Sequence, residues 1–255
     1  MGRSLGFPSR ILLSASRGAL IEPLLRARLD GAAVRVADSP GAIKRTLSEG
    51  TPRFDLVVVD LTWDDYRDGF HFDGLDVLKV IRQRDLDVPV IFTVRGSASE
   101  RDHVDEATTK PHVAGFCLKE FGPELLAEAI ATVLKGGTLT GSDFPSCGNP
   151  RGVTSINDYF NRGQRGSTAA RMAGAIASGR VVNAETLERV TRIPPGTAAR
   201  PQDYLGPLIR ERGEHPGDLR ITQGVLYRWC GEHARYILSW CRRNGLGQIS
   251  DRENY

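Results

Sequence analysis

Two charged residues, Asp60 and Lys119, end apolar runs that have the composition of buried strands. The run Phe54–Asp60 is apolar at consecutive rather than alternate positions, which is typical of a strand in a parallel sheet covered on both faces. A second such run, Val113–Lys119, ends in the lysine. Open α/β sheets bind ligands at the carboxyl ends of their strands, so this pair predicts a charged site at that edge of a sheet.

The segment up to residue 137 alternates between strand patterns and amphipathic helix patterns. Such β-α repeats give right-handed crossovers, so we predict an α/β fold with a doubly wound, five-stranded parallel sheet. The expected strands are Ile11–Ser14, Ala33–Ala37, Phe54–Asp60, Val88–Val94 and Val113–Lys119. The expected helices are Gly18–Leu29, a helix capped by Ser39-Pro40 that ends at Leu47, Asp73–Arg84, Ser99–Thr108 and Gly122–Lys135.

The remainder of the chain is helical in pattern and predicts a second, smaller, all-α domain. Residues 138–155 are rich in Gly, Ser, Thr and Pro, and we interpret them as a linker between domains at 9–137 and 156–246. Residues 247–255 are expected to form a flexible tail. The helices expected in the second domain are Thr168–Ser178 with Ser167 as cap, Ala184–Arg192 with Asn183 as cap, a broken stretch Thr197–Arg212, and a last helix Ile221–Arg243.

Composition excludes several classes of protein. The 255 residues are 40% hydrophobic and 25% charged, as in ordinary globular domains. No apolar window reaches the length of a membrane span, and the first residues lack the apolar core of a signal peptide, so we expect a cytoplasmic protein without a membrane partner. The cysteines lack the paired spacing of zinc sites, and we interpret them as reduced thiols: Cys117, Cys147, Cys230 and Cys241.

The charge is distributed unevenly between the two predicted domains. Residues 1–150 hold 18 basic and 21 acidic residues, whereas residues 151–255 hold 16 basic and 10 acidic residues. All basic residues of the second part are arginine, the side chain best suited to phosphate and base-edge recognition. The excess of positive charge therefore favours a nucleic-acid partner for the helical domain.

The first domain resembles the receiver domain of two-component response regulators over roughly residues 9–137. The likeness lies in the β-α order, in Asp60 after the third strand, in Asp73-Gly74-Leu75 at the third helix, and in Lys119 after the fifth strand. In that family the aspartate accepts a phosphoryl group from a histidine kinase in a phosphorelay, and the lysine contacts the phosphoryl oxygens. The resemblance implies these roles for Asp60 and Lys119. It also implies that Phe116, three residues before the lysine, is a switch residue.

The sequence departs from this family where the metal should bind. Family members carry an acidic pair after the first strand that helps to bind Mg²⁺, but Ser14-Ala15-Ser16 stands at this place. Mg²⁺ prefers octahedral oxygen ligands with one or two carboxylates, and phosphoryl transfer requires the cation to neutralise charge. We therefore predict an atypical receiver without a dedicated cofactor, in which Asp60 is either phosphorylated or held in a structural ion pair with Lys119.

A second departure concerns the fourth strand, where the family has a switch Ser or Thr. Counting from Pro89 places this position on Val94, with Thr93 one residue early. A shift of one residue moves a strand side chain to the other face of the sheet, and a bulge would restore Thr93.

A third departure is the long acidic and aromatic loop between Asp60 and Gly74. Three interpretations remain open. Asp64 or Asp65 folds back to supply metal ligands, the loop is a lid or a contact for a partner, or its aromatic residues pack onto the domain. The aromatic residues concerned are Trp63, Phe70 and Phe72.

In the helical domain, Ala184–Arg192, a Pro-Gly turn and the stretch from Thr197 resemble a helix-turn-helix. Such a motif places the N-terminal residues of its second helix at base edges in the major groove. Because Pro201 interrupts a helix from Thr197, the second helix alternatively begins at Pro201, with Pro207 inside it. The predicted base-reading residues are Thr197, Arg200 and Gln202, and the predicted phosphate contacts are Arg189, Arg192, Arg210 and Arg212.

Together these features predict a response regulator that controls transcription by binding duplex DNA as a homodimer. A histidine kinase or another protein regulator is the expected partner of the receiver-like domain. The alternative is a signalling adaptor whose helical domain binds another protein. We predict no enzyme, because the sequence offers neither a nucleophile–base arrangement nor paired catalytic carboxylates.

Overall fold

The computed structural model describes residues 9–48, 53–63, 71–139 and 152–250. The chain divides into two compact units, Met1–Gly148 and Asn149–Tyr255. Most of the predicted linker, 138–155, and the end of the predicted tail lie outside the described residues. Among the described residues, none of the helices combines the length and apolar composition needed to cross a membrane.

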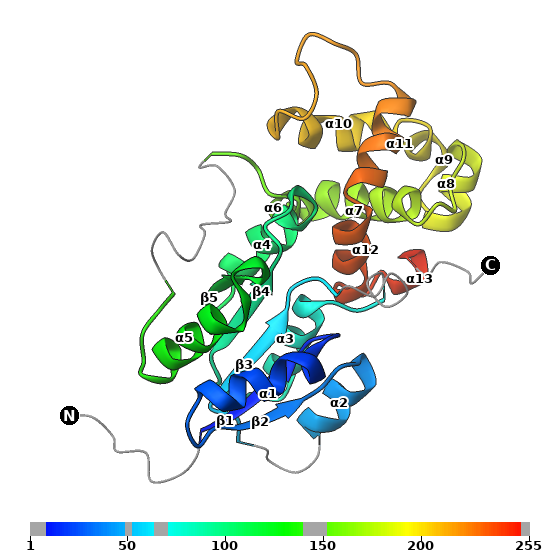
Figure 1. The fold of residues 1–255 in the computed structure, drawn as a ribbon. Helices are drawn as coiled ribbons and strands as arrows, with labels where there is room; N and C mark the ends of the chain where they lie inside the picture. Colours follow the sequence, from blue (N-terminus) through cyan, green and yellow to red (C-terminus); the bar gives the residue numbers. More distant parts are fainter. Residues whose placement is uncertain (1–8, 49–52, 64–70, 140–151, 251–255) are drawn as a thin grey trace. The chain divides into compact units, whose positions relative to one another are not determined.

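The first unit is built on a five-stranded parallel sheet with the order β2-β1-β3-β4-β5 (Figure 1). This confirms the predicted doubly wound α/β fold, because the order reverses beside β1 as it does in flavodoxin-like sheets. The strands are β1 (Arg10–Ser14), β2 (Ala33–Val36), β3 (Leu56–Asp60), β4 (Val90–Val94) and β5 (Val113–Leu118).

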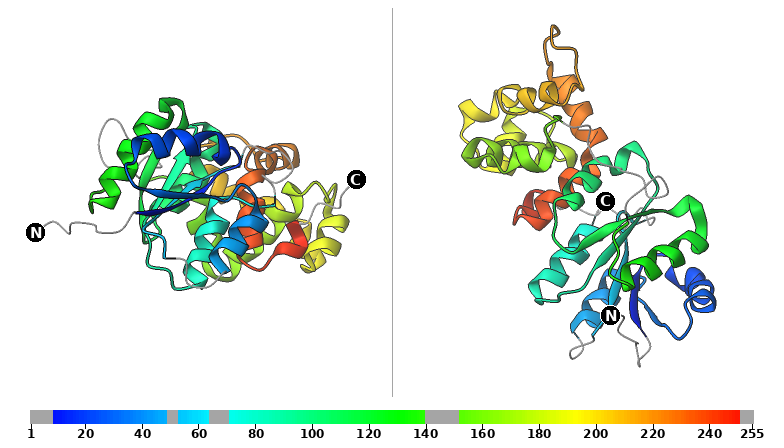
Figure 2. Two further views of the ribbon diagram at one scale, coloured as in Figure 1. Left: turned by 60° about the horizontal axis from the view of Figure 1, so that its bottom comes forward. Right: turned by 90° about the vertical axis from the view of Figure 1, so that its left-hand side faces the viewer.

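Helices cover both faces of this sheet. The right-hand view of Figure 2 shows α1 and α5 on one side and α2 and α3 on the other. The helices are α1 (Gly18–Arg28), α2 (Pro40–Ser48), α3 (Gly74–Gln83), α4 (Arg101–Thr108) and α5 (Gly122–Leu134), with short 3-10 turns η2 (Ala98–Glu100) and η3 (Lys119–Phe121). The central strands are buried throughout, as their continuous apolar runs predict.

Alternate strand residues build the core beneath α1 and α5. Leu13, Val58, Ile91 and Cys117 from four neighbouring strands belong to one buried cluster with the inner face of α5, including Ile130. Because side chains alternate along a strand, this face also carries the residues two positions further along, at the carboxyl edge of the sheet. The core thus fixes the direction in which the edge residues Asp60 and Thr93 project.

The second unit consists of helices arranged around a central one, α7. This helix contacts α6, α8, α10, α11, α12 and α13, and its buried stripe is composed largely of alanine. The helices are α6 (Ile156–Phe160), α7 (Gly163–Ala177), α8 (Ala184–Thr191), α9 (Pro195–Ala198), α10 (Pro201–Glu211), α11 (Gln223–Glu232), α12 (Ala234–Arg243) and α13 (Gly247–Ser250). Small side chains on α7 allow this close packing. A Cβ atom on Gly174 would lie 2.6 Å from Cys241 Sγ.

Three sequence expectations for this unit are wrong. Ser167 caps no helix, because α7 already begins at Gly163; Gly166 lies inside α7, where a Cβ atom would lie 2.3 Å from the Tyr159 carbonyl oxygen. The last helix is divided at His233 into α11 and α12. Residues 247–250, expected in the tail, form α13, whose Ile249 is buried.

Pro207 lies inside α10 without ending it. Proline cannot donate the hydrogen bond that the Asp203 carbonyl would accept one turn earlier. The Arg165 guanidinium donates to this oxygen instead, at 2.6 Å. The second helix therefore begins at Pro201 and continues to Glu211, as the second of the two interpretations predicts.

Gly74 allows α3 to start directly against the end of β3. Its N–H donates to the Leu61 carbonyl oxygen, and the neighbouring Asp73 forms a capping box with Asp76. A Cβ atom at residue 74 would lie 2.7 Å from the Asp60 carbonyl oxygen and 2.9 Å from Phe92 Cε1. Residue 74 must therefore lack a side chain for α3 to pack this closely against the strand end that carries Asp60.

We predict that Gly74→Ala lowers the free energy of unfolding by about 1–3 kcal/mol, because backbone and a buried ring cannot yield to the added methyl group. Chemical denaturation of the full chain measures this effect. The control is Gly41→Ala on α2, where the added atom meets only the end of the Arg45 side chain. Equal stability of the two variants would contradict the assigned role of Gly74.

Candidate functional site

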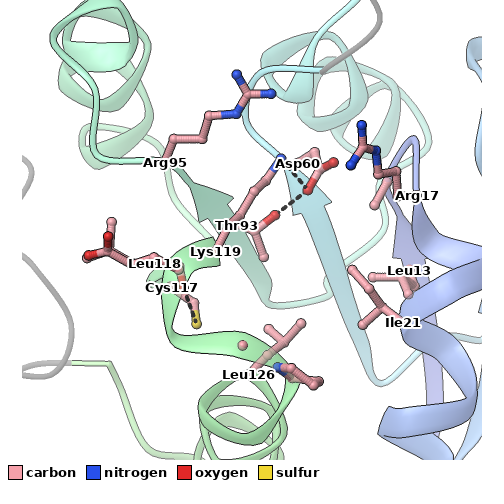
Figure 3. A pocket seen from close by; sticks show the side chains of 14 residues that line it. Leu13, Arg17, Ile21, Asp60, Thr93, Arg95, Cys117, Leu118, Lys119 and Leu126 are labelled. Carbon is pink, nitrogen blue, oxygen red and sulfur yellow. Dashed lines mark hydrogen bonds and ion pairs between the residues drawn. The ribbon is translucent and has the colours of Figure 1, made fainter.

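Asp60 is the last residue of β3 and lies at the carboxyl edge of the sheet with 6% of its surface exposed. Thr93 Oγ1 donates a hydrogen bond to Asp60 Oδ1 at 2.5 Å, and Lys119 Nζ lies 3.1 Å from the same oxygen (Figure 3). The structure therefore brings together three of the predicted site residues from β3, β4 and the end of β5.

The strand register explains why Thr93, and not Val94, lies at this site. Asp60 pairs with Thr93 in the parallel β3–β4 ladder, so both side chains project from the same face. The placement of the family's fourth-strand position on Val94 is wrong, and Val94 is fully buried. The register irregularity in this region lies between β4 and β5, beside Gly115.

Asp60 and Lys119 form a partly buried ion pair. The side chain of Lys119 is 24% exposed and that of Asp60 is 8% exposed. A pair of this kind loses hydration on both sides, and removal of one partner leaves an uncompensated charge. The sequence predicts that Asp60 is either phosphorylated or paired with Lys119, and the structure has the ion pair.

Phe116, the predicted switch residue, is buried and packs on Phe92. The two rings are stacked, with centroids 6.0 Å apart. Phe116 belongs to β5, two positions before its last residue, and pairs with Phe92 in the β4–β5 ladder. In this structure its side chain is part of the core on the face opposite to Asp60 and Thr93.

The long loop after Asp60 is described only at its ends. Trp63 and Phe72 are buried, with their rings in an edge-to-face contact at 6.0 Å. These two aromatic residues therefore pack onto the domain. Asp64, Asp65 and Phe70 lie outside the described residues. The interpretations of the loop as a source of metal ligands or as a lid concern these undescribed residues and stay predictions.

Glu100 is a residue of this region that the sequence patterns do not single out. Its carboxylate accepts hydrogen bonds from the backbone N–H groups of Arg95 and Gly96, at 2.7 and 3.1 Å, and from Thr62 Oγ1. It joins the loop after β4 to the loop after β3, and it is 2% exposed. The only sequence signal is an acidic residue at the start of a helix.

Among the described residues, the donor set at Asp60 does not fit Mg²⁺. The stretch Ser14-Ala15-Ser16, where the family carries its acidic pair, has no carboxylate, so Asp60 is the one carboxylate that the described residues place at the end of β1 or β3. Among the described residues, no group of three or more His, Cys, Asp or Glu side chains is arranged to hold a metal ion. A hard cation needs more anionic oxygen ligands than this.

Cys117 lines the same region from β5 but is no candidate nucleophile. Burial raises the pKa of its thiol to about 11, so the reactive thiolate is scarce at neutral pH. The Asp60, Thr93 and Lys119 side chains offer charge and hydrogen bonds at this edge of the sheet.

In the helical unit, four of the predicted phosphate-contacting or base-reading arginines are exposed. They are Arg189, Arg192, Arg200 and Arg210. Thr197 and Gln202 are partly exposed, the first in α9 and the second in the first turn of α10. Arg200 is 67% exposed on its side chain and donates to the Gly196 carbonyl oxygen at 3.1 Å.

The assignment of Arg212 as a phosphate contact is wrong. Its side chain is 1% exposed, and its guanidinium donates two hydrogen bonds to the Glu214 carboxylate, at 2.8 and 2.9 Å. A third bond reaches the Thr154 carbonyl oxygen. Charge and position alone did not reveal that this arginine folds inward, because its partner lies in the loop after α10 rather than in a helix.

Glu214 is the centre of a polar network in this unit. Besides Arg212, Trp229 Nε1 donates to it at 2.6 Å and His233 Nε2 lies 3.4 Å away. Burial opposes its ionisation, but the hydrogen bonds from His233, Arg212 and Trp229, together with the charge of Arg212, hold its pKa well below the usual range. The network thereby attaches the loop after α10 to the bend between α11 and α12.

Comparison with known proteins yields likeness of structure only. No protein-family model and no curated protein sequence matches this chain. The complex of the two-component response regulator RcsB with DNA is 13% identical with a TM-score of 0.49, over 88% of this chain and 98% of that chain. RcsB from Salmonella typhimurium is likewise 13% identical over these shares, with a TM-score of 0.43. The receiver domain of the Francisella response regulator 1452 is 17% identical with a TM-score of 0.39, over 50% and 97%.

The arrangement of elements agrees with the predicted resemblance. The chain combines a receiver-like α/β unit of strand order β2-β1-β3-β4-β5 with an all-helical unit that follows it.

We predict that Ala15→Asp combined with Ser16→Asp creates a Mg²⁺ site beside Asp60, because it supplies the carboxylates that a hard cation requires. Isothermal titration calorimetry should detect Mg²⁺ binding by this variant and none by the unaltered chain. The matched control, Ala15→Asn with Ser16→Asn, has the same size without the charge. Mg²⁺ binding by the unaltered chain would contradict the interpretation of this edge.

We predict that Glu214→Gln lowers the free energy of unfolding by about 1–3 kcal/mol at neutral pH, because hydrogen bonds to a charged group are lost. The folded-state pKa is depressed, so the stabilisation is present above the ordinary pKa of 4.5 and is lost as pH falls below it. Denaturation of both chains between neutral and acid pH should show their difference shrinking below that value. Glu232→Gln, on the exposed surface of α11, is the control, and a difference independent of pH would disprove the assignment.

Proposed function

We propose that this chain is an atypical response regulator whose helical unit binds duplex DNA. The receiver-like unit acts without the standard Mg²⁺-dependent phosphorylation of Asp60, and it governs assembly of a homodimer. DNA binding by the helical unit is supported by the surplus of arginine in residues 151–255 and by the exposure of four of these side chains: Arg189, Arg192, Arg200 and Arg210. Binding to DNA, whatever the base sequence, depends first on neutralising the charge of the phosphates.

The proposed reading surface is formed by the segment from α8 to α10. Asn183 caps α8 with a capping box, and Arg192 ends it in the left-handed conformation, so the chain turns at once into Pro194-Pro195. The second helix of the proposed motif is α10, with Gln202 in its first turn. Because the first turn of a recognition helix meets base edges, Thr197, Arg200 and Gln202 are the proposed reading residues.

The proposed phosphate contacts are Arg189, Arg192 and Arg210. Arg189 and Arg192 lie at the carboxyl end of α8, and Arg210 lies in the last turn of α10. Arginine suits this task because its planar fork matches phosphate oxygens. A homodimer would present this surface twice, which suits an operator of two half-sites.

The proposed state of Asp60 follows from its neighbours. Oδ1 is engaged by both Thr93 and Lys119, and the stretch Ser14-Ala15-Ser16, where the family carries metal-binding carboxylates, has none. Without a cation, charge developing on a transferred phosphoryl group has no counterpart there. We infer that Asp60 and Lys119 serve as a structural pair. A histidine kinase is then unnecessary as a partner, and another regulator takes its place.

A second candidate function is a signalling adaptor whose helical unit binds another protein. Val182 and Leu219 favour it, because both are large apolar residues of this unit, and they are 71% and 52% exposed. Burial of apolar side chains in an interface makes the free energy of binding more favourable, and this contribution depends little on salt. Salt dependence therefore separates the two candidate functions.

We predict that the full chain binds duplex DNA from its own upstream region more tightly than random duplex, with affinity falling steeply as salt rises. Fluorescence anisotropy over a salt series measures this. Arg192→Ala with Arg200→Ala should reduce the slope of log affinity against log salt by about one unit, since Arg192 is the one proposed phosphate contact of the two, and should reduce the preference for the upstream duplex through loss of Arg200. Arg45→Ala with Arg17→Ala, which removes the same charge from the receiver-like unit, should leave the slope unchanged.

Two results would count against this proposal. Unchanged affinity and slope in the Arg192 and Arg200 variant would refute the assigned surface. No binding at low salt by the folded chain would refute DNA binding itself. It would favour the signalling adaptor, with Val182 and Leu219 in its contact surface.

A further inference from the structure

A hollow of about 310 Å³ lies among the helices of the second unit. It is bordered by α8, by the segment from the end of α9 into the first turn of α10, and by the start of α11 (Figure 1). Gln202, one of the proposed reading residues, lines it, so the hollow continues the proposed reading surface. Three buried apolar residues form its inner part: Leu187, Ala198 and Ile221.

Half of the residues that line this hollow are polar or charged. They are six of the twelve: Asn183, Gln202, Arg220, Thr222, Gln223 and Tyr227. Two of the six are occupied as helix caps, since Asn183 Oδ1 accepts from the Thr186 N–H and Thr222 Oγ1 accepts from the Val225 N–H. The other four side chains form no hydrogen bond or ion pair within the described part of the chain. Each of these four can donate hydrogen bonds.

Arg220 gives the hollow a positive charge that its lining does not compensate. None of the described residues that line it is acidic. The guanidinium is exposed and has no carboxylate partner among the described residues, in contrast to Arg200, whose Nε lies 3.9 Å from Asp203 Oδ2. An arginine accompanied by neutral donors and by no acid suits an anion with several acceptor oxygens.

Packing between α10 and α11 fixes the place of Arg220. The next residue, Ile221, is buried, and its Cδ1 atom would lie 3.3 Å from a Cβ atom on Gly206 of α10. Thr222 follows as the cap of α11. Because Arg220 directly precedes these two anchored residues, its backbone is held at the hollow, and binding has to order little more than its side chain.

We propose that this hollow seats a backbone phosphate of duplex DNA. Arg220 is the charged contact, and Gln223 and Tyr227 are neutral donors, side-chain types that commonly bind DNA phosphates. The inference rests on the proposed function, and it adds α11 to a surface that otherwise extends from α8 to α10. Continuity with Gln202 and the excess of positive charge in this part of the chain favour DNA over a protein partner.

The seat is separate from the phosphate contact proposed for Arg192. The hollow includes Asn183 and Ala184 at the start of α8, whereas Arg192 follows the last residue of this helix. The eight residues of α8 span about 12 Å. The two arginines can therefore engage different phosphates, and their contributions to the salt dependence should add.

The test measures binding of the full chain to duplex DNA by fluorescence anisotropy over a salt series. Arg220→Gln should reduce the slope of log affinity against log salt by about one unit and weaken binding about fivefold to tenfold near about 0.1 M salt. The upstream and the random duplex should lose the same factor, because phosphate contacts carry no sequence information. The matched control is Arg228→Gln, an exposed arginine of α11 outside the hollow, which should change neither quantity.

A carboxylate introduced into the lining should act in the same direction. Gln223→Glu keeps the shape of the side chain and adds a negative charge, so DNA affinity should fall about tenfold at low salt. Gln164→Glu adds the same charge to the first turn of α7, outside the hollow, and should have a much smaller effect. Equal weakening by these two variants would show that net charge alone matters, and it would overturn the seat.

Duplexes with one neutral methylphosphonate linkage, moved along the strand position by position, identify the seated phosphate. At one position the neutral linkage should weaken the unaltered chain and leave Arg220→Gln unaffected, because the interaction it removes is already absent from the variant. Equal weakening of both proteins at every position would contradict the assignment of Arg220.

The outcomes distinguish this inference from the proposed function. DNA binding with an unchanged slope in Arg220→Gln would overturn the phosphate seat and leave DNA binding in place. No DNA binding by the folded, unaltered chain would overturn both. The hollow would then favour a protein partner, because the exposed apolar residues Val182 and Leu219 directly precede two of its lining residues.

Discussion

The pairing of Asp60 with Thr93 in the β3–β4 ladder is the constraint on which the edge of the sheet depends. It directs a carboxylate and a hydroxyl to the same face, where Lys119 completes the group from the end of β5. The core below holds this register, because a slip of one residue would turn every buried side chain of β4 toward the other face. Gly74 maintains the edge from the other side by letting α3 start against the Asp60 backbone.

The end of β1 distinguishes this edge from that of the receiver family. The stretch Ser14-Ala15-Ser16 has no carboxylate, so the Asp60 side chain meets Lys119 and Thr93 without a second acid from β1. The fold, the strand register and the Asp60–Lys119 pair form without the acidic pair. The same backbone arrangement can thus carry different sets of charged groups, depending on small side chains at the end of one strand.

Much of this architecture could be predicted from sequence because it rests on local patterns. Continuous apolar runs identify β3 and β5, and they place Asp60 and Lys119 at one edge. The position of Thr93 could not be obtained by counting from Pro89, because register is a property of the ladder between two strands. No sequence pattern singles out Glu100 for a similar reason, since its hydrogen-bond partners belong to two loops that come together only in the fold.

The helical unit was less predictable, because its features depend on contacts between helices. Arg212 has the sequence context of a surface arginine, yet Glu214 and Thr154 enclose it. The bend at His233 follows Gly231, and it coincides with a tilted contact between His233 and Trp229, whose ring centroids lie 4.6 Å apart. Ser167 is a residue type that commonly caps helices, but α7 begins earlier, at Gly163, where it packs closely against α6.

The hydrogen bond from Arg165 to the Asp203 carbonyl oxygen has a consequence for the history of the sequence. Proline at position 207 leaves that oxygen without its helical donor, and the Arg165 side chain supplies a donor from another helix. Loss of the arginine is therefore expected to cost α10 more when residue 207 is proline than when it carries a backbone N–H. The two positions are coupled in this sense, so the residue at one of them limits what is tolerated at the other.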